Sequence, residues 1–204
     1  EKQVKKIILS MKKSSRPVIL LGGGIKISQS EKKLSQFIKN LQIPLVTTWS
    51  GVDLINYDNK KYIGNVGVYG SRAANFAVQN SDLLLCLGSR LDTRITGGVP
   101  KSFARKAKVI SVDIDKNELS KQRGLKLFLK VHSDLLDFFT SLYWLIALYS
   151  YFFVVSGFNK ESSYLLFFCI TYSIIDWIIC LFFSQRIVRR HNIKLGYKII
   201  KRLK

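Results

Sequence analysis

The sequence predicts an α/β fold, a doubly wound parallel sheet followed by two long apolar helices. Three observations support this fold class. Short apolar runs without alternation end in glycine or in a polar residue, as strands buried on both faces do. Stretches with helical spacing separate these runs. Two nearly uncharged stretches, 138–158 and 162–183, then follow the last run.

Apolar runs predict five strands in the first part of the chain. The run from Leu83 to Leu87 follows a turn-prone Asn80-Ser81-Asp82 and precedes Gly88, which is typical of a buried strand. Segment 1–15 is predicted to be a short amphipathic helix or a linker from a preceding domain, and 51–70 an irregular connection. The strands are predicted at 16–21, 43–48, 83–87, 108–114 and 128–131, and the helices at 30–41, 71–79, 117–121 and from 134 onward.

Polar residues and glycines follow four of these strands. Because carboxyl ends of parallel strands meet at one edge, we expect these residues to converge where open α/β folds bind ligands. They are Gly22, Gly23 and Gly24 after the first strand, Thr47 and Thr48 after the second, Gly88, Ser89, Arg90, Asp92 and Arg94 after the third, and Asp113 at the end of the fourth.

The loop after Gly88 favours a phosphorylated ligand. Guanidinium groups of Arg90 and Arg94 match phosphate oxygens, and Asp92 between them suits hydroxyl donors of a ribose or ribityl chain. Asp113 at a strand end is placed as in folds that hold a ribose hydroxyl. The alternative is a salt-bridged surface loop beside ordinary glycine turns.

The composition argues against a nucleic-acid partner and against a metal site, and it favours no particular function. The net charge of +20 raises nucleic acid as a partner, but the lysines are scattered and no nucleic-acid motif accompanies them. The three cysteines lack metal-ligand spacing, and His132 and His191 have no catalytic partner in the pattern, so neither a metal site nor a catalytic residue is predicted. The first residue is Glu1, which leads us to expect a chain cut from a longer one.

Several motifs in order carry a resemblance to a known family. They are Arg16-Pro17-Val18-Ile19-Leu20-Leu21-Gly22-Gly23-Gly24, Ile43-Pro44-Leu45-Val46-Thr47-Thr48, Gly64-Asn65-Val66-Gly67-Val68-Tyr69-Gly70, Gly88-Ser89-Arg90-Leu91-Asp92-Thr93-Arg94-Ile95-Thr96-Gly97 and Val112-Asp113-Ile114-Asp115. Through them, residues 16–139 resemble the central domain of thiamine-diphosphate-dependent enzymes of the acetolactate synthase group. The resemblance implies a Rossmann-like domain of six strands over 16–137.

The resemblance also implies a cofactor and its contacts. In acetolactate synthase this domain holds a structural FAD, while relatives bind another adenine nucleotide or none. The sequence departs from the family at Val68-Tyr69, where Met-His is usual, and at Leu91 and Thr93, where Phe and Asp are common. The implied contacts are Gly22, Gly23, Arg90, Asp92 and Arg94 for the diphosphate and ribityl chain, Thr48, Trp49, Gly67, Val68 and Tyr69 for the flavin chain, and Asp113, Ile114 and Asp134 for adenosine.

Catalysis in the family requires two further domains. Thiamine diphosphate and Mg²⁺ lie between an amino-terminal domain that supplies a glutamate and a carboxyl-terminal domain that begins with Gly-Asp-Gly. The sequence contains no Gly-Asp-Gly. We therefore expect these cofactors only in the complete enzyme and no carboligation or decarboxylation by this chain alone.

The last part of the chain does not resemble the family. The stretches 138–158 and 162–183 have the length of membrane spans, and the basic segment 185–204 follows them. Basic flanks and a short connection predict a hairpin over 138–184 with both ends cytoplasmic, and a tail that faces anionic lipid. The alternatives are a buried pair of core helices or the product of a frameshift.

Two functions remain open at this point. The first is the central domain of a thiamine-diphosphate enzyme, with missing catalytic domains or a second copy as partners. The second is a membrane-tethered, non-enzymatic module that binds a nucleotide.

Overall fold

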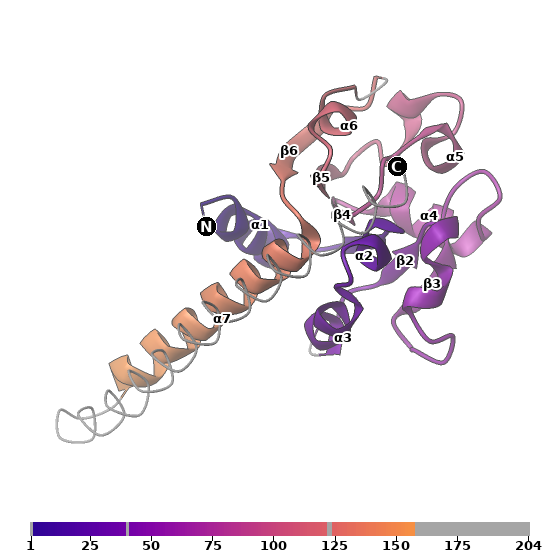
Figure 1. Cartoon of the computed structure of the whole chain (residues 1–204). Helices are drawn as coiled ribbons and strands as arrows, with labels where there is room; N and C mark the ends of the chain where they lie inside the picture. Colours follow the sequence, from indigo (N-terminus) through magenta and orange to yellow (C-terminus); the bar gives the residue numbers. More distant parts are fainter. Residues whose placement is uncertain (1, 40, 122–123, 158–204) are drawn as a thin grey trace, which may run out of the picture. The chain divides into compact units, whose positions relative to one another are not determined.

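Six parallel strands form one sheet in the order β3-β2-β1-β4-β5-β6 (Figure 1). The computed structural model describes residues 2–39, 41–121 and 124–157, with side chains described as far as residue 148. The predicted doubly wound parallel sheet is confirmed. The strands are β1 (Pro17–Leu21), β2 (Leu45–Thr47), β3 (Tyr62–Asn65), β4 (Leu83–Leu87), β5 (Lys108–Asp113) and β6 (Leu127–His132).

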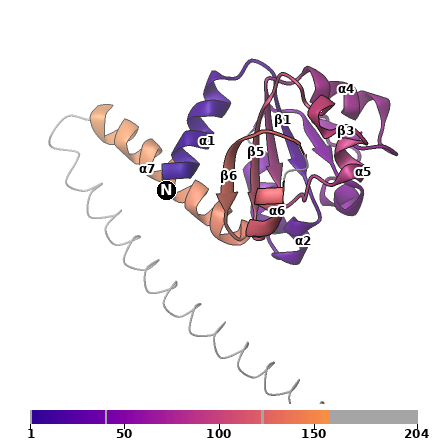
Figure 2. The ribbon, with the colours of Figure 1, turned by 90° about the horizontal axis from the view of Figure 1, so that it is seen from above.

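Helices connect the strands and cover both faces of the sheet (Figure 2). The helices and strands up to residue 148 belong to one compact unit, Glu1–Leu148. A second unit begins at Tyr149. Ser71 caps α4 by accepting the N–H of Ala74, as expected for serine before a helix. The helices are α1 (Lys2–Lys13), α2 (Gly24–Ile27), α3 (Glu31–Lys39), η1 (Trp49–Leu54), α4 (Arg72–Asn80), α5 (Thr93–Thr96), η2 (Pro100–Ser102), α6 (Lys116–Lys121) and α7 (Leu135–Gly157).

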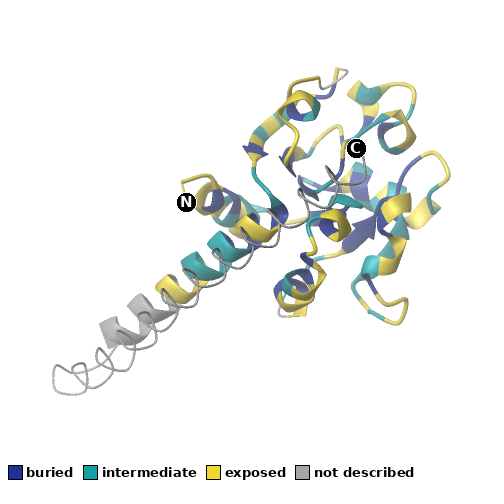
Figure 3. Cartoon of the chain, viewed as in Figure 1, coloured by how far each residue is buried: buried dark blue, intermediate teal, exposed yellow. Residues whose placement is uncertain are grey.

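The strands are apolar on both faces because each face packs against its own helical layer. Alternate residues of β1 and β4, such as Ile19 and Leu85, pack with α1, α3 and α7 in one core. Their neighbours Leu20 and Cys86 pack with α4 in the other. Figure 3 shows the buried strands between the more exposed helices. This double burial explains the unalternating apolar runs.

The middle of the domain differs from the prediction, whereas its start agrees with one of the two predicted alternatives. The segment 51–70 contains β3, an edge strand whose residues are all half-buried, so its sequence lacks a continuous apolar run. Segment 2–13 is the predicted helix, and Val4 and Ile7 are buried in the same core as the sheet. Of the two predicted alternatives for this segment, helix is correct, and α1 packs as part of the domain.

The predicted first membrane span requires correction at its start. Phe138, Phe139 and Leu142 of α7 are buried in the core against the sheet, so these residues cannot face lipid. In the part of the chain that the structure describes, no helix is long and apolar enough to cross a membrane. The predicted second span, 162–183, and the basic segment 185–204 lie outside the described residues.

Candidate functional site

A large cleft lies at the carboxyl ends of the strands. The strand order reverses between β1 and β4, which is where doubly wound sheets open a crevice for ligands. Loops after β1, β2, β3, β4, β5 and β6 all line the cleft, whose volume is about 1260 Å³. The predicted convergence at this edge is therefore confirmed for the loops.

Glycines bring the backbones of the two central loops together. The Gly22 N–H donates to the Leu87 carbonyl at 2.9 Å, and the Gly24 N–H donates to the Gly88 carbonyl at 3.0 Å. A Cβ on Gly22 would lie 2.1 Å from the Gly88 carbonyl oxygen, so no side chain fits there. Gly88 itself has φ +61°, a conformation that favours glycine. These glycines shape the floor between β1 and β4.

Most of the predicted site residues line the cleft, but Gly22, Thr47, Gly67 and Val68 do not. Gly22 packs against the backbone of Gly88, while the backbones of Gly67 and Val68 lie against the loop after β4. A Cβ on Gly67 would lie 2.5 Å from the Arg94 carbonyl oxygen, which accepts the Val68 N–H at 2.8 Å. The predicted residues on the cleft surface are Gly23, Gly24, Thr48, Trp49, Tyr69, Gly88, Ser89, Arg90, Asp92, Arg94, Asp113, Ile114 and Asp134.

Asp92 has a local role besides its place in the cleft wall. Its Oδ1 accepts the N–H of Arg94 at 3.0 Å and of Ile95 at 3.3 Å, so the carboxylate caps α5. The same residue therefore orients the loop that carries Arg94. The sequence pattern predicted hydroxyl binding for Asp92 and did not predict this cap.

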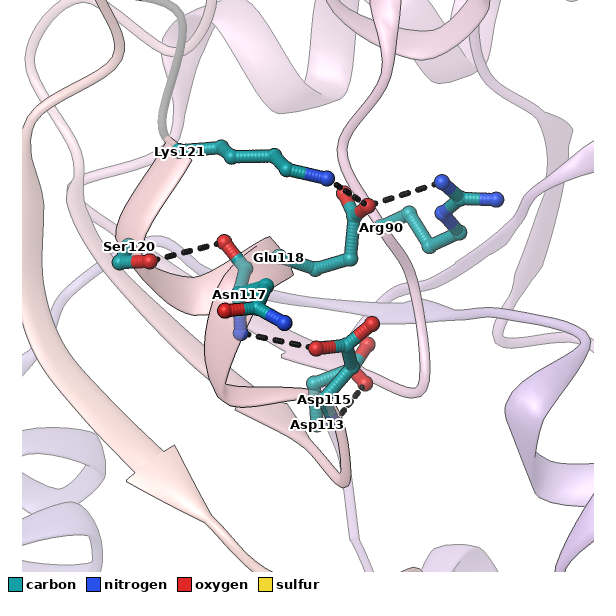
Figure 4. Close-up of polar contacts among 7 residues, drawn as sticks. All are labelled: Arg90, Asp113, Asp115, Asn117, Glu118, Ser120 and Lys121. Carbon is teal, nitrogen blue, oxygen red and sulfur yellow. Dashed lines mark hydrogen bonds and ion pairs between the residues drawn. The ribbon is translucent and has the colours of Figure 1, made fainter.

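Arg90 bonds to a carboxylate that the sequence did not single out. Its Nη2 donates to Oε1 of Glu118 at 2.8 Å, and Lys121 Nζ lies 3.3 Å from the same oxygen (Figure 4). Hydrogen bonds from Arg90 lower the pKa of Glu118, and Glu118 raises the pKa of Arg90. The predicted alternative, a salt-bridged loop, thus holds for Arg90, although the loop lines the cleft.

Carboxylates gather at the β5 end of the cleft. Asp113 is buried, and burial raises the pKa of its carboxyl, whose Oδ1 accepts the Asp115 N–H at 2.9 Å. Asp134 accepts the Leu136 N–H at 2.7 Å, at the first turn of α7. The acids Asp113, Asp115, Glu118 and Asp134 suit hydroxyl donors of a sugar, while Lys26, Arg90 and Arg94 of the same cleft suit phosphate.

Aromatic side chains and hydroxyls complete the wall on the β2 side. Trp49 and Tyr69 are exposed and meet edge to face, with ring centroids 6.3 Å apart. Thr48 and Ser50 share a hydrogen bond of 3.2 Å between their hydroxyls. Among the described residues, no group of three or more His, Cys, Asp or Glu is arranged to hold a metal ion. The cleft therefore offers stacking surfaces, hydroxyls and charges of both signs.

The strand order and the position of this cleft are those of the doubly wound α/β class. The chain belongs to the family of thiamine pyrophosphate enzymes, central domain, which matches residues 4–142. The resemblance predicted from the motifs is confirmed at this level, and the match includes α1 and the beginning of α7.

Individual relatives are large subunits of acetolactate synthases. The chain is 39% identical over 120 residues to the probable acetolactate synthase large subunit of Methanococcus aeolicus, a match to 59% of this chain and 20% of that protein. It is 39% identical over 111 residues to the acetolactate synthase isozyme 2 large subunit of Escherichia coli K12, which covers 54% of this chain and 20% of that protein. The chain spans about a fifth of the length of these relatives.

Proposed function

We propose that this chain supplies the central domain of an acetolactate synthase-like, thiamine-diphosphate-dependent enzyme and that its cleft binds FAD or another adenine nucleotide. The cleft at the strand-order reversal carries this proposal, because its wall combines cations, hydroxyls and carboxylates. Thiamine diphosphate and Mg²⁺ belong to the complete enzyme, with further domains or a second copy as partners.

The residues present fit such a ligand chemically. Arg90 and Arg94 would hold the diphosphate, because guanidinium groups bond phosphate oxygens at fixed geometry. Carboxylates such as Asp113 and Asp134 would accept sugar hydroxyls, and Trp49 offers an exposed ring for stacking. Bound FAD would contribute structural support of the domain, as in the synthases that the motifs resemble.

Titration of the full chain with FAD, followed by flavin fluorescence, tests the proposal. We expect saturable binding in the micromolar range or tighter, and about tenfold to hundredfold weaker binding for Arg90→Gln, which removes charged hydrogen bonds to phosphate. Lys32→Gln removes an equal charge on the exposed face of α3 and should bind as the wild type does. No binding of FAD, ADP or ATP better than millimolar would reject the nucleotide site.

Membrane attachment is a separate proposal, and its motive is the sequence alone. Stretch 162–183, which lies outside the described residues, is nearly uncharged, and basic residues follow it. A membrane-tethered nucleotide-binding module would fractionate with membranes and resist carbonate extraction. A full chain that remains monodisperse without detergent would contradict this function and leave the enzyme-domain proposal intact.

A further inference from the structure

Glu118 lies between two exposed cations, Arg90 and Lys121, and both contact its carboxylate. Its side chain is 6% exposed, whereas those of Arg90 and Lys121 are 66% and 57% exposed. Both cations contact the same oxygen, Oε1, at 2.8 and 3.3 Å. Glu118 lines both a small cavity beside α6 and the main cleft. Figure 4 shows its carboxylate between Arg90 and Lys121.

The bond to Glu118 uses one nitrogen of the Arg90 guanidinium. Arg90 Nη2 is the donor, and the remaining nitrogens of this exposed side chain are left for another acceptor. A phosphate bound by those nitrogens would therefore lie about one guanidinium width from the Glu118 carboxylate. Asp92 and Asp115 add further negative charge around Arg90, because both also favour its charged form.

Coulomb repulsion at this distance is moderate and grows with the charge of the ligand. Each negative charge of a ligand about 7 Å from Glu118 would weaken binding roughly threefold in a water-like medium. Lys121 reduces this effect by partly neutralising the same carboxylate. An internal diphosphate with two charges is therefore tolerated, whereas a terminal diphosphate or triphosphate is disfavoured.

We propose that Glu118 is a specificity-determining residue of the cleft, which selects dinucleotides with an internal diphosphate over mononucleotides that end in free phosphates. This inference rests on the proposed nucleotide site and names the kind of ligand that the site prefers. Arg90 attracts phosphate groups. The negative charge of Glu118 weakens the binding of ligands that carry more phosphate charge.

Calorimetric titration of the full chain with adenosine, AMP, ADP, ATP and FAD tests this inference. Glu118→Gln keeps the shape of the side chain and an oxygen that accepts from Arg90, but removes the charge. We expect it to leave adenosine binding unchanged and to tighten ADP about fivefold to tenfold, with a larger gain for ATP and a smaller one for FAD. These gains should shrink in 0.5 M salt, because salt screens the repulsion.

Asp58→Asn is the matched control, since it removes an equal charge on an exposed turn away from the cleft. It should bind all five ligands as the wild type does. If the wild type binds FAD but Glu118→Gln binds ATP no more tightly, the inference is wrong while the nucleotide site stands. An equal change for adenosine and ATP would also overturn it, because that result indicates a structural role. A wild type that binds none of the five rejects both proposals.

Discussion

Single glycines decide how closely the two central loops approach each other. The Gly22 and Gly88 backbones pack in direct contact, and Gly22 N–H and Gly24 N–H both bond to carbonyls of the neighbouring segment. This contact closes the floor of the cleft between β1 and β4. A side chain at Gly22 would separate these loops and disturb the cleft and the sheet together.

Gly22→Ala should destabilise the fold by about 1–3 kcal/mol or more, because its Cβ would overlap the Gly88 carbonyl oxygen. Chemical denaturation, followed by circular dichroism, measures this change. Gly98→Ala is the control, since a Cβ there meets nothing within 4 Å, and its stability should change by less than about 0.5 kcal/mol. Equal stabilities of the two variants would contradict the packing described here.

For single residues, the sequence predicts where a side chain lies better than which group it bonds to. Strand-end residues such as Arg90 and Asp113 lie on the cleft because parallel strands bring their carboxyl ends to one edge. The cap made by Asp92 was not predicted, because a strand-end carboxylate can bond to its own loop or to a ligand. Glu118 was missed because α6 reads as a charged surface helix, and the partner of Glu118 is Arg90, 28 residues earlier.

Elements are joined to the sheet by a few specific contacts. The Asp82 carboxylate, at the start of β4, accepts the Ser14 hydroxyl, the Ser15 N–H at 2.8 Å and the Arg16 N–H at 2.9 Å. These bonds fix the segment between α1 and β1 beside β4. Burial opposes the charge of Asp82, but the hydrogen bonds from these residues outweigh it and lower the pKa of the carboxyl.

Asp82→Asn should cost about 1–3 kcal/mol of stability at neutral pH, because several donors lose a charged acceptor. Since the folded pKa is lowered, the stabilisation is present above the unfolded pKa near 4 and is lost as pH falls through the folded pKa. Urea denaturation at pH 7 and pH 3 measures both variants. The difference between them should be smaller at pH 3, and a constant difference would contradict the ionised role of Asp82.

The beginning of α7 belongs to the sheet domain, as the burial of Phe139 indicates. Phe139→Ala should therefore destabilise the domain by about 3–5 kcal/mol, the cost of a large cavity in a core. Thermal and urea denaturation measure the loss. Leu136→Ala, at an exposed position in the same helix, should cost far less. If Phe139→Ala left the stability unchanged, the beginning of α7 would again be interpreted as part of a membrane span.

Most strands and the longer helices were predicted, whereas β3 and the short helices α2, η1, α5 and η2 were not. β1 and β4 are apolar and buried on both faces, and such unalternating apolar runs predict strands of a parallel sheet. β3 contains Gly64 and lies at the edge of the sheet, so its sequence has no continuous apolar run. Its hydrogen-bonded pairing with β2 identifies it as a strand. The predicted span included Phe138, Phe139 and Leu142, which pack in the core, because uncharged residues fit a protein core as well as lipid.

At the scale of the whole molecule, the chain matches one domain of a larger type of enzyme. Its relatives are about five times as long as the matched region. The domain described here contributes a folded sheet and a polar cleft. Its place in a complete enzyme is part of the proposed function.

The chain alone should not form acetolactate from pyruvate when thiamine diphosphate and Mg²⁺ are added. The sequence lacks the Gly-Asp-Gly that begins the Mg²⁺-binding motif of the family. A colorimetric assay for acetoin after acid decarboxylation measures the product, with a complete acetolactate synthase as the positive control. Product above background after repurification of the chain would contradict this prediction.

The position of a bound cofactor tests the central claim most directly. A crystal structure of the full chain grown with FAD should show the diphosphate above the carboxyl ends of β1 and β4, within hydrogen-bond distance of Arg90, and the adenosine toward Asp113. FAD bound outside this cleft, or with its diphosphate away from the strand-order reversal, would contradict the assignment of the site.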